Sequence, residues 1–181
     1  MVNIYKLKLT CLQQEILRLL FIKVGKTLNA RAIAKSLNVS QPAVSKALPK
    51  LEKEELIILS KDKESKRLSI ELNRDDHRVV WLKRADNLKQ IYESGLVQFL
   101  YNNFPETTII LFGSYSNGQD VITSDIDLAV IGSKKNINLQ KYENILERTI
   151  NINNYESFKK IDKHLLDNIL NGILIKGAVE L

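Results

Sequence analysis

Two apolar segments joined by a loop that begins with Gly-Ser constrain the fold of this chain more than any other feature. Residues 107–112 are short, apolar and rich in β-branched side chains, which predicts a strand. Gly113 follows and lets the backbone turn sharply, because glycine has no Cβ. Ser114 offers a hydroxyl and a backbone N–H, which suit a phosphate group. A second strand is predicted at residues 124–131.

The second predicted strand carries two aspartates, Asp125 and Asp127. Side chains two residues apart on a strand share one face, with Cα atoms about 6–7 Å apart. Carboxylates this close repel each other unless a cation lies between them, and Mg²⁺ takes one or two carboxylates together with substrate phosphates. Alone, Gly-Ser could be a turn and Asp-Ile-Asp-Leu a half-exposed strand. Their combination favours a site for Mg²⁺ with ATP or another nucleoside triphosphate.

The segment resembles the nucleotidyltransferase superfamily related to DNA polymerase beta, in particular its minimal members. The family signature is an apolar residue, Gly-Ser, a spacer and Asp-x-Asp. This chain supplies each part of it with Phe112, Gly113, Ser114, Asp125 and Asp127. The resemblance covers about residues 95–181 and implies a small mixed sheet flanked by helices. It also implies that Gly113 and Ser114 bind the triphosphate, and that Asp125 and Asp127 are catalytic and bind Mg²⁺.

One departure from the family concerns a third carboxylate on a later strand. The matching strand here is expected at residues 149–153, where the polar positions are Asn151 and Asn153. A neutral amide neither takes a proton usefully nor balances the charge of Mg²⁺. Glu147 and Glu156 lie nearby in sequence, but we expect them in a helix or a turn.

Three functions stay open for this half of the chain. The first is transfer of a nucleotidyl group to a hydroxyl acceptor. The second is a non-enzymatic transcriptional regulator with a degenerate nucleotide-sensing or scaffold domain, which the two asparagines favour. The third is an antitoxin-like role beside a HEPN-type protein partner, which rests on analogy alone. Flanking patterns predict helices at residues 139–148 and 157–170 and a final strand at residues 173–175.

The N-terminal half has the pattern of a winged helix-turn-helix. Helices are predicted at residues 10–23 and 29–37, and a third begins after the cap Ser40. Only a short turn separates the second and third helices. Two strands, at residues 56–59 and 68–72, flank a charged loop. Residues 10–73 resemble the winged helix-turn-helix domains of MarR- and ArsR-type regulators, which implies that the third helix enters the major groove of double-stranded DNA.

The outward side chains of this half suggest their roles. Gln41 and Ser45 could read base edges, whereas Lys46 and Lys50 would meet phosphates. The basic tip of the wing consists of Lys61, Lys63, Lys66 and Arg67. Pro49 is expected to kink the third helix and leave residues 41–48 as the reading segment. The alternative is a protein-docking module, because winged helices also serve that purpose.

Charge is distributed unevenly along the 181 residues. Residues 1–75 hold 15 Lys and Arg against 8 Asp and Glu, a formal charge of +7, whereas residues 76–181 hold 12 against 13, a formal charge of −1. The basic half indicates a polyanionic partner. No apolar stretch suits a membrane span, no signal peptide is evident, and the single cysteine excludes an intrachain disulfide, so we expect a cytoplasmic protein without a membrane partner.

A long helical pattern links the two halves. It runs from about residue 76 to residue 102, and residues 93–95 could split it into two helices. Its apolar stripe is predicted to be core or the seam of a homodimer, and consists of Trp81, Ala85, Leu88, Tyr92, Leu96 and Phe99. We therefore expect an α+β protein in three parts. These are a DNA-binding domain at residues 1–75, a helical connector at residues 76–94 and a nucleotidyltransferase domain at residues 95–181.

Overall fold

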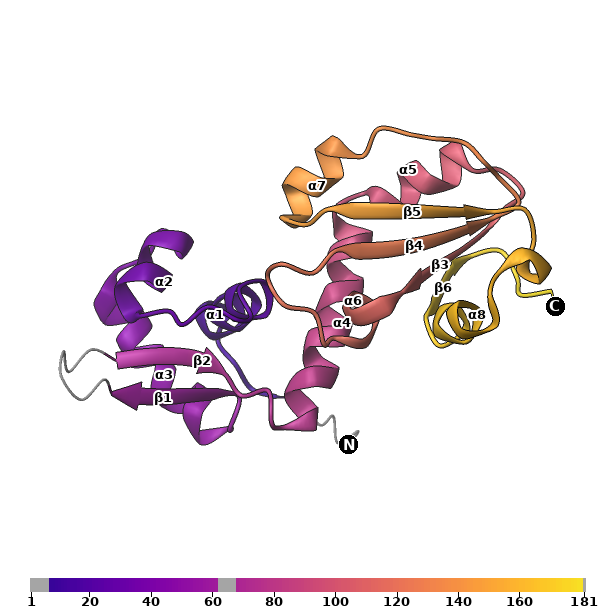
Figure 1. The fold of residues 1–181 in the computed structure, drawn as a ribbon. Helices are drawn as coiled ribbons and strands as arrows, with labels where there is room; N and C mark the ends of the chain where they lie inside the picture. The colour runs from indigo at the N-terminus through magenta and orange to yellow at the C-terminus, as the bar shows by residue number, and fades with distance from the viewer. Residues whose placement is uncertain (1–6, 62–67, 181) are drawn as a thin grey trace, which may run out of the picture. The chain divides into compact units, whose positions relative to one another are not determined.

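The computed structural model describes residues 7–61 and 68–180, and the chain forms two compact units, residues 1–79 and 80–181 (Figure 1). Within the described residues, no helix combines the length and the apolar character that crossing a membrane requires.

Three helices build most of the N-terminal unit, and polar caps fix where each begins. Helix α1 (Cys11–Ile22) follows Thr10, whose side chain accepts a hydrogen bond from the backbone of Gln13, while the Gln13 side chain accepts one from Thr10. Helix α2 (Ala30–Leu37) is capped by an asparagine, and α3 (Gln41–Lys53) by a serine. The turn between α2 and α3 is short, as the helix-turn-helix pattern predicts.

Strands β1 (Ile57–Lys61) and β2 (Leu68–Leu72) form the antiparallel hairpin of the wing, with Ile57 opposite Leu72. The core of this unit joins all three helices to the hairpin through fully buried side chains, among them Ile16, Ile33, Val44, Leu51 and Ile70. Burial of these apolar side chains supplies the main stabilisation, at about 25 cal/mol for each Å² of apolar surface removed from water.

Helix α3 contains Pro49 in its interior, where a kink is expected from the sequence. The helix continues through this residue to Lys53. Leu48 and Leu51 are buried on the two sides of the proline, whose own ring is exposed. Packing of the flanking leucines therefore outweighs the cost of about 3 kcal/mol for a proline inside a helix.

A four-stranded mixed sheet forms the centre of the C-terminal unit (Figure 1). Its order is β5 (Ile150–Tyr155), β4 (Ile126–Ile131), β3 (Thr108–Phe112) and β6 (Ile173–Lys176). The β4–β5 pair is parallel and the other two pairs are antiparallel. The predicted α+β class, with a winged helix-turn-helix and a small mixed-sheet domain, is confirmed.

Helices cover both faces of this sheet because its strands alternate apolar side chains between the faces. Ile109, Leu111 and Leu128 pack with residues of α4 (His77–Glu93), α5 (Leu96–Asn103) and α7 (Gln140–Leu146). On the other face, Ile110 and Ala129 pack with the short helix η1 (Phe158–Lys160) and with α8 (Lys163–Leu170). One further short helix, α6 (Gly113–Asn117), follows β3 directly.

The predicted apolar stripe of the connector is wrong in its first part. Trp81 is 66% exposed and Tyr92 is 51% exposed, whereas the buried side of α4 carries Lys83, Asn87 and Ile91. The helix is rotated in this way because Lys83 and Asn87 find polar partners in the loop after α6. Further along the stripe, as predicted, Leu96 is buried, and Leu88 and Phe99 are partly buried. The homodimer seam stays a prediction.

Candidate functional site

The Gly-Ser turn lies against the second aspartate of the Asp-x-Asp pair. Phe112 at the end of β3 is opposite Asp127 of β4 in the antiparallel register. Gly113 has a φ of 75°, and a Cβ built on it would lie 2.8 Å from Asp127 Oδ2. A side chain at this position would therefore meet both backbone strain and a collision with the carboxylate. Ser114 follows as the second residue of α6 and is partly buried.

Asp125, Asp127 and Asn151 meet at one end of the sheet. Asp127 belongs to β4, and Asp125 lies immediately before this strand. The parallel register places Asn151 of β5 opposite Asp127. Asn151 Nδ2 donates to Asp125 Oδ2 at 3.1 Å and to Asp127 Oδ1 at 3.3 Å. The two carboxylates therefore converge on one amide group.

This arrangement fits Mg²⁺ only if other groups complete the coordination. Within the described residues there is no group of three or more His, Cys, Asp and Glu side chains that could hold a metal ion. Two convergent carboxylates are nevertheless the share that a protein usually gives to Mg²⁺ when substrate phosphates supply further oxygens. Asp125 and Asp127 would hold the ion in such a complex.

The other polar residues near β5 occupy different places. Asn153 is opposite Ala129, two positions beyond Asn151 on the strand. Glu147 ends α7 in the left-handed conformation. Glu156 accepts a hydrogen bond from the Lys134 ammonium, with the two atoms 2.5 Å apart, and this contact lowers the pKa of the Glu156 carboxyl.

A buried polar cluster around Asp120 anchors the loop between α6 and β4. Asp120 is 1% exposed, and its Oδ1 accepts hydrogen bonds from the Lys83 ammonium and from Asn87 Nδ2. Its Oδ2 lies 3.5 Å from a guanidinium nitrogen of Arg148. Asn87 Nδ2 also donates to the backbone carbonyl of Tyr115 at 2.9 Å. This cluster could not be predicted from the sequence, since lysine and asparagine on a helix usually indicate a solvated face.

Gly118 lets this loop approach α4 closely. Its φ is 73°, and a Cβ there would lie 2.5 Å from the Val80 carbonyl oxygen and 2.8 Å from the Arg84 backbone nitrogen. The loop that leads from Ser114 to Asp125 is therefore held by direct backbone packing as well as by the Asp120 cluster. A rigid support of this kind is what a preorganised site requires.

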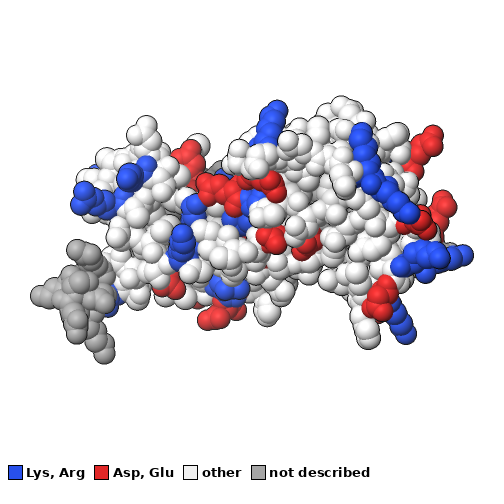
Figure 2. All heavy atoms as spheres, turned by 45° about the horizontal axis from the view of Figure 1, so that its top comes forward, with Lys and Arg blue, Asp and Glu red and all other residues white. Residues whose placement is uncertain are grey.

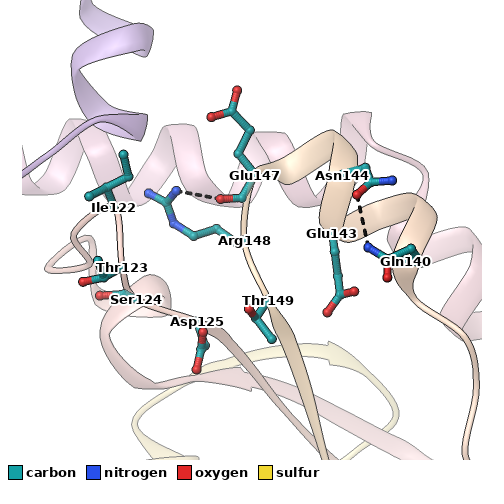
Figure 3. Close-up of a pocket in the computed structure, with 10 residues that line it drawn as sticks. All are labelled: Ile122, Thr123, Ser124, Asp125, Gln140, Glu143, Asn144, Glu147, Arg148 and Thr149. Carbon is teal, nitrogen blue, oxygen red and sulfur yellow. Dashed lines mark hydrogen bonds between the residues drawn. The ribbon is translucent and has the colours of Figure 1, made fainter.

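An open cavity of about 480 Å³ adjoins the aspartate pair. Asp125 and Thr149 form part of its wall, Glu143 extends from α7, and Arg148 points toward the segment that carries Ile122 (Figure 3). The Glu143 carboxylate accepts a hydrogen bond from the backbone N–H of Ile150 at 3.0 Å. Because the cavity shares Asp125 with the aspartate pair, a molecule bound in it would lie beside the proposed metal position.

The predicted DNA-contacting side chains fall into three groups. Gln41, Ser45 and Lys46 are exposed on α3, and Lys61 is exposed at the end of β1. Lys50 is partly buried, and its ammonium donates to the backbone carbonyl of Lys8. The remaining three predicted contacts lie outside the described residues, and they are Lys63, Lys66 and Arg67. On the face drawn in Figure 2, basic side chains predominate over the N-terminal unit.

Two known protein families match the chain, one in each of its two compact units. Residues 94–179 match the family described as polymerase beta, nucleotidyltransferase. Residues 9–69 match the MarR family. The chain thus combines a MarR-like DNA-binding domain with a nucleotidyltransferase domain.

Individual relatives resemble parts of the chain. Protein adenylyltransferase MntA of Shewanella oneidensis is 37% identical over 57 residues, which are 31% of this chain and 41% of MntA. This chain therefore spans less than half of that relative. A variant of Lactococcus lactis ZitR has a TM-score of 0.43 at 27% identity, with 58% of this chain and 68% of ZitR covered. AdcR from Streptococcus pyogenes has the same TM-score and identity, with 57% and 72% covered.

Proposed function

We propose that this chain is a DNA-binding transcriptional regulator whose nucleotidyltransferase domain binds Mg²⁺–ATP and transfers the nucleotidyl group to a hydroxyl acceptor. The convergence of Gly113, Asp125 and Asp127 at one end of the sheet carries the proposal, because it joins a phosphate-accessible turn to two acceptor-only side chains. ATP is the preferred nucleotide in this proposal because the relative MntA is named an adenylyltransferase.

In the proposed reaction, Ser114 binds a phosphate group through its hydroxyl and its backbone N–H. The acceptor oxygen forms a new bond to the α-phosphorus, the bond to the pyrophosphate breaks, and the acceptor hydroxyl loses its proton. Asp125 and Asp127 would hold Mg²⁺, which supplies charge that stabilises the leaving pyrophosphate. The Asn151 amide cannot accept the proton, so the proton must go to one of the aspartates or to solvent.

The cavity beside Asp125 is the proposed location of the acceptor. Hydroxyl, amide and carboxylate groups line it, so it suits a polar acceptor. The relative MntA is named a protein adenylyltransferase, and we extend this class of acceptor, a protein, to the present chain. A hydroxyl-bearing side chain of a HEPN-type partner is one acceptor of this class.

A second candidate function is nucleotide sensing without transfer. Asn151 favours it, because the amide occupies the position at which a third carboxylate would complete the metal site. In that case nucleotide binding would persist, but no label would pass to an acceptor. Incubation of the pure protein and a cell lysate with α-³²P-labelled ATP separates the two functions. Covalent label that depends on Asp125 and Asp127 supports transfer, whereas nucleotide binding without any label supports sensing.

For the N-terminal domain we propose that α3 reads the major groove through Gln41 and Ser45, with Lys46 on the phosphates. Phosphate contacts release counterions, so the affinity for duplex DNA should fall steeply as salt rises. Electrophoretic or fluorescence titration of duplex DNA at several salt concentrations tests this proposal. Salt-independent or absent binding would point to a protein-docking winged helix instead. A homodimer on a palindromic site and a cytoplasmic location complete the proposal.

A further inference from the structure

Asn151 is the one side chain of the described residues that hydrogen-bonds to both carboxylates of the aspartate pair. Its Nδ2 lies 3.1 Å from Asp125 Oδ2 and 3.3 Å from Asp127 Oδ1, and its two N–H groups are enough for one hydrogen bond to each carboxylate. The partial positive charge of the amide thus lies where the negative charges of the pair converge. In the structure, a neutral donor takes the place that a cation would occupy between two carboxylates.

This contact follows from the register of the sheet. Strands β4 and β5 are parallel, and Asp127 is directly opposite Asn151. On its other side Asp127 lies close to Gly113, where a Cβ would come within 2.8 Å of Asp127 Oδ2. Asp125 is exposed and lies before the strand, so Asn151 is the residue that ties it to Asp127. The amide therefore links the two carboxylates.

We propose that Asn151 is a positioning residue that holds the aspartate pair together without a metal and keeps its affinity for free divalent cations low. The inference rests on the proposed function and deepens it, because it specifies how the cation arrives. A free cation must displace two N–H···O hydrogen bonds and then finds only two carboxylates. Mg²⁺ gives up its water reluctantly. A triphosphate supplies the oxygens and negative charge that a third carboxylate would otherwise give, so the cation binds as its nucleotide complex.

The substitution Asn151→Asp tests this role with little change in shape. It replaces the two donors by a third carboxylate, which repels the pair in the metal-free protein and attracts a divalent cation. Asn153→Asp is the matched control, because it adds the same charge to the same strand two positions away, opposite Ala129. An increase in affinity for divalent cations that both variants share would come from the added negative charge alone.

In the experiment, each full-length protein is titrated with Mn²⁺ in the absence of nucleotide. Binding is measured by calorimetry and by the electron spin resonance signal of free Mn²⁺. We expect Asn151→Asp to bind Mn²⁺ at least about tenfold more tightly than wild type, since even groups behind the metal ligands change metal affinity about 10–100-fold. Asn153→Asp should resemble wild type. Equal affinity of wild type and Asn151→Asp, or an equal gain in both variants, would overturn the proposal.

Thermal unfolding gives a second readout. Without metal, the Asn151→Asp variant should have a lower Tm than wild type. Added Mn²⁺ should raise its Tm by more than it raises that of wild type, because a ligand that binds only the folded state stabilises it. Tighter Mn²⁺ binding by this variant supports the role of Asn151 even if no protein binds ATP, in which case the proposed function fails alone. If wild type binds Mg²⁺–ATP but Asn151→Asp binds Mn²⁺ no more tightly than wild type, the proposed function stands and the proposed role of Asn151 fails.

Discussion

Replacement of Asp120 by asparagine should destabilise the C-terminal unit more than any conservative surface substitution. The Asp120 carboxylate is 1% exposed, accepts hydrogen bonds from Lys83 and Asn87, and lies within ion-pair distance of Arg148. Both cationic side chains are themselves buried, at 2% and 3% exposure. The substitution keeps the size of the side chain but removes its negative charge from a place that water does not reach.

The expected loss follows from the burial of this cluster. Removal of one partner of a buried ion pair costs about 3–5 kcal/mol, because the remaining charge stays in a poorly solvated place. We expect the lower end, about 3 kcal/mol, since the amide oxygen of asparagine can still accept from Lys83. In a unit of this size each kcal/mol lowers the Tm by about 4–8 °C, so the expected fall is about 12–24 °C.

Circular dichroism during thermal and urea unfolding measures the effect. Asp167→Asn is the matched control, because Asp167 is an exposed aspartate on α8, and it should leave the stability within about 0.5 kcal/mol of wild type. A loss below about 1 kcal/mol in Asp120→Asn would refute the reasoning. It would mean that the cluster is hydrated in solution or that the loop detaches from α4.

The remaining predictions concern the two glycines of the loop and the reading helix. Gly113→Ala should weaken Mg²⁺–ATP binding at least about tenfold in calorimetry, because the new methyl group would lie 2.8 Å from Asp127 Oδ2 in a strained backbone conformation. Gly118→Ala should lower the Tm in scanning calorimetry, since its Cβ would lie 2.5 Å from the Val80 carbonyl oxygen; an unchanged Tm would contradict the close packing. Gln41→Ala should reduce discrimination between cognate and mismatched duplexes by about 1–3 kcal/mol in competition titrations, with non-specific binding retained.

Local patterns predicted the parts of the site that depend on neighbours in sequence. The apolar run before Gly113 and the alternation around Asp127 are sufficient to predict two strands, and the structure contains both. The same holds for the Ser40 cap and the short turn of the helix-turn-helix, because capping is decided within a few residues.

Contacts between distant segments escaped prediction for a physical reason. The exposed Trp81 and the buried Lys83 reverse the usual preferences of these residues, and only the distant Asp120 explains why the lysine is buried. Asn151 was recognised from the sequence as a neutral residue on the later strand. Its contact with both aspartates depends on the parallel register of β4 and β5, which hydrophobic periodicity does not specify.

The most direct test of the proposed nucleotide site is the calorimetric titration of the wild-type protein with ATP, with and without Mg²⁺, beside the double variant Asp125→Asn/Asp127→Asn. We predict that wild type binds ATP in a Mg²⁺-dependent manner and that the double variant loses this binding while it remains folded. Absence of binding by wild type, or equal binding by both proteins, would contradict the assignment of Asp125 and Asp127 to a metal–nucleotide site.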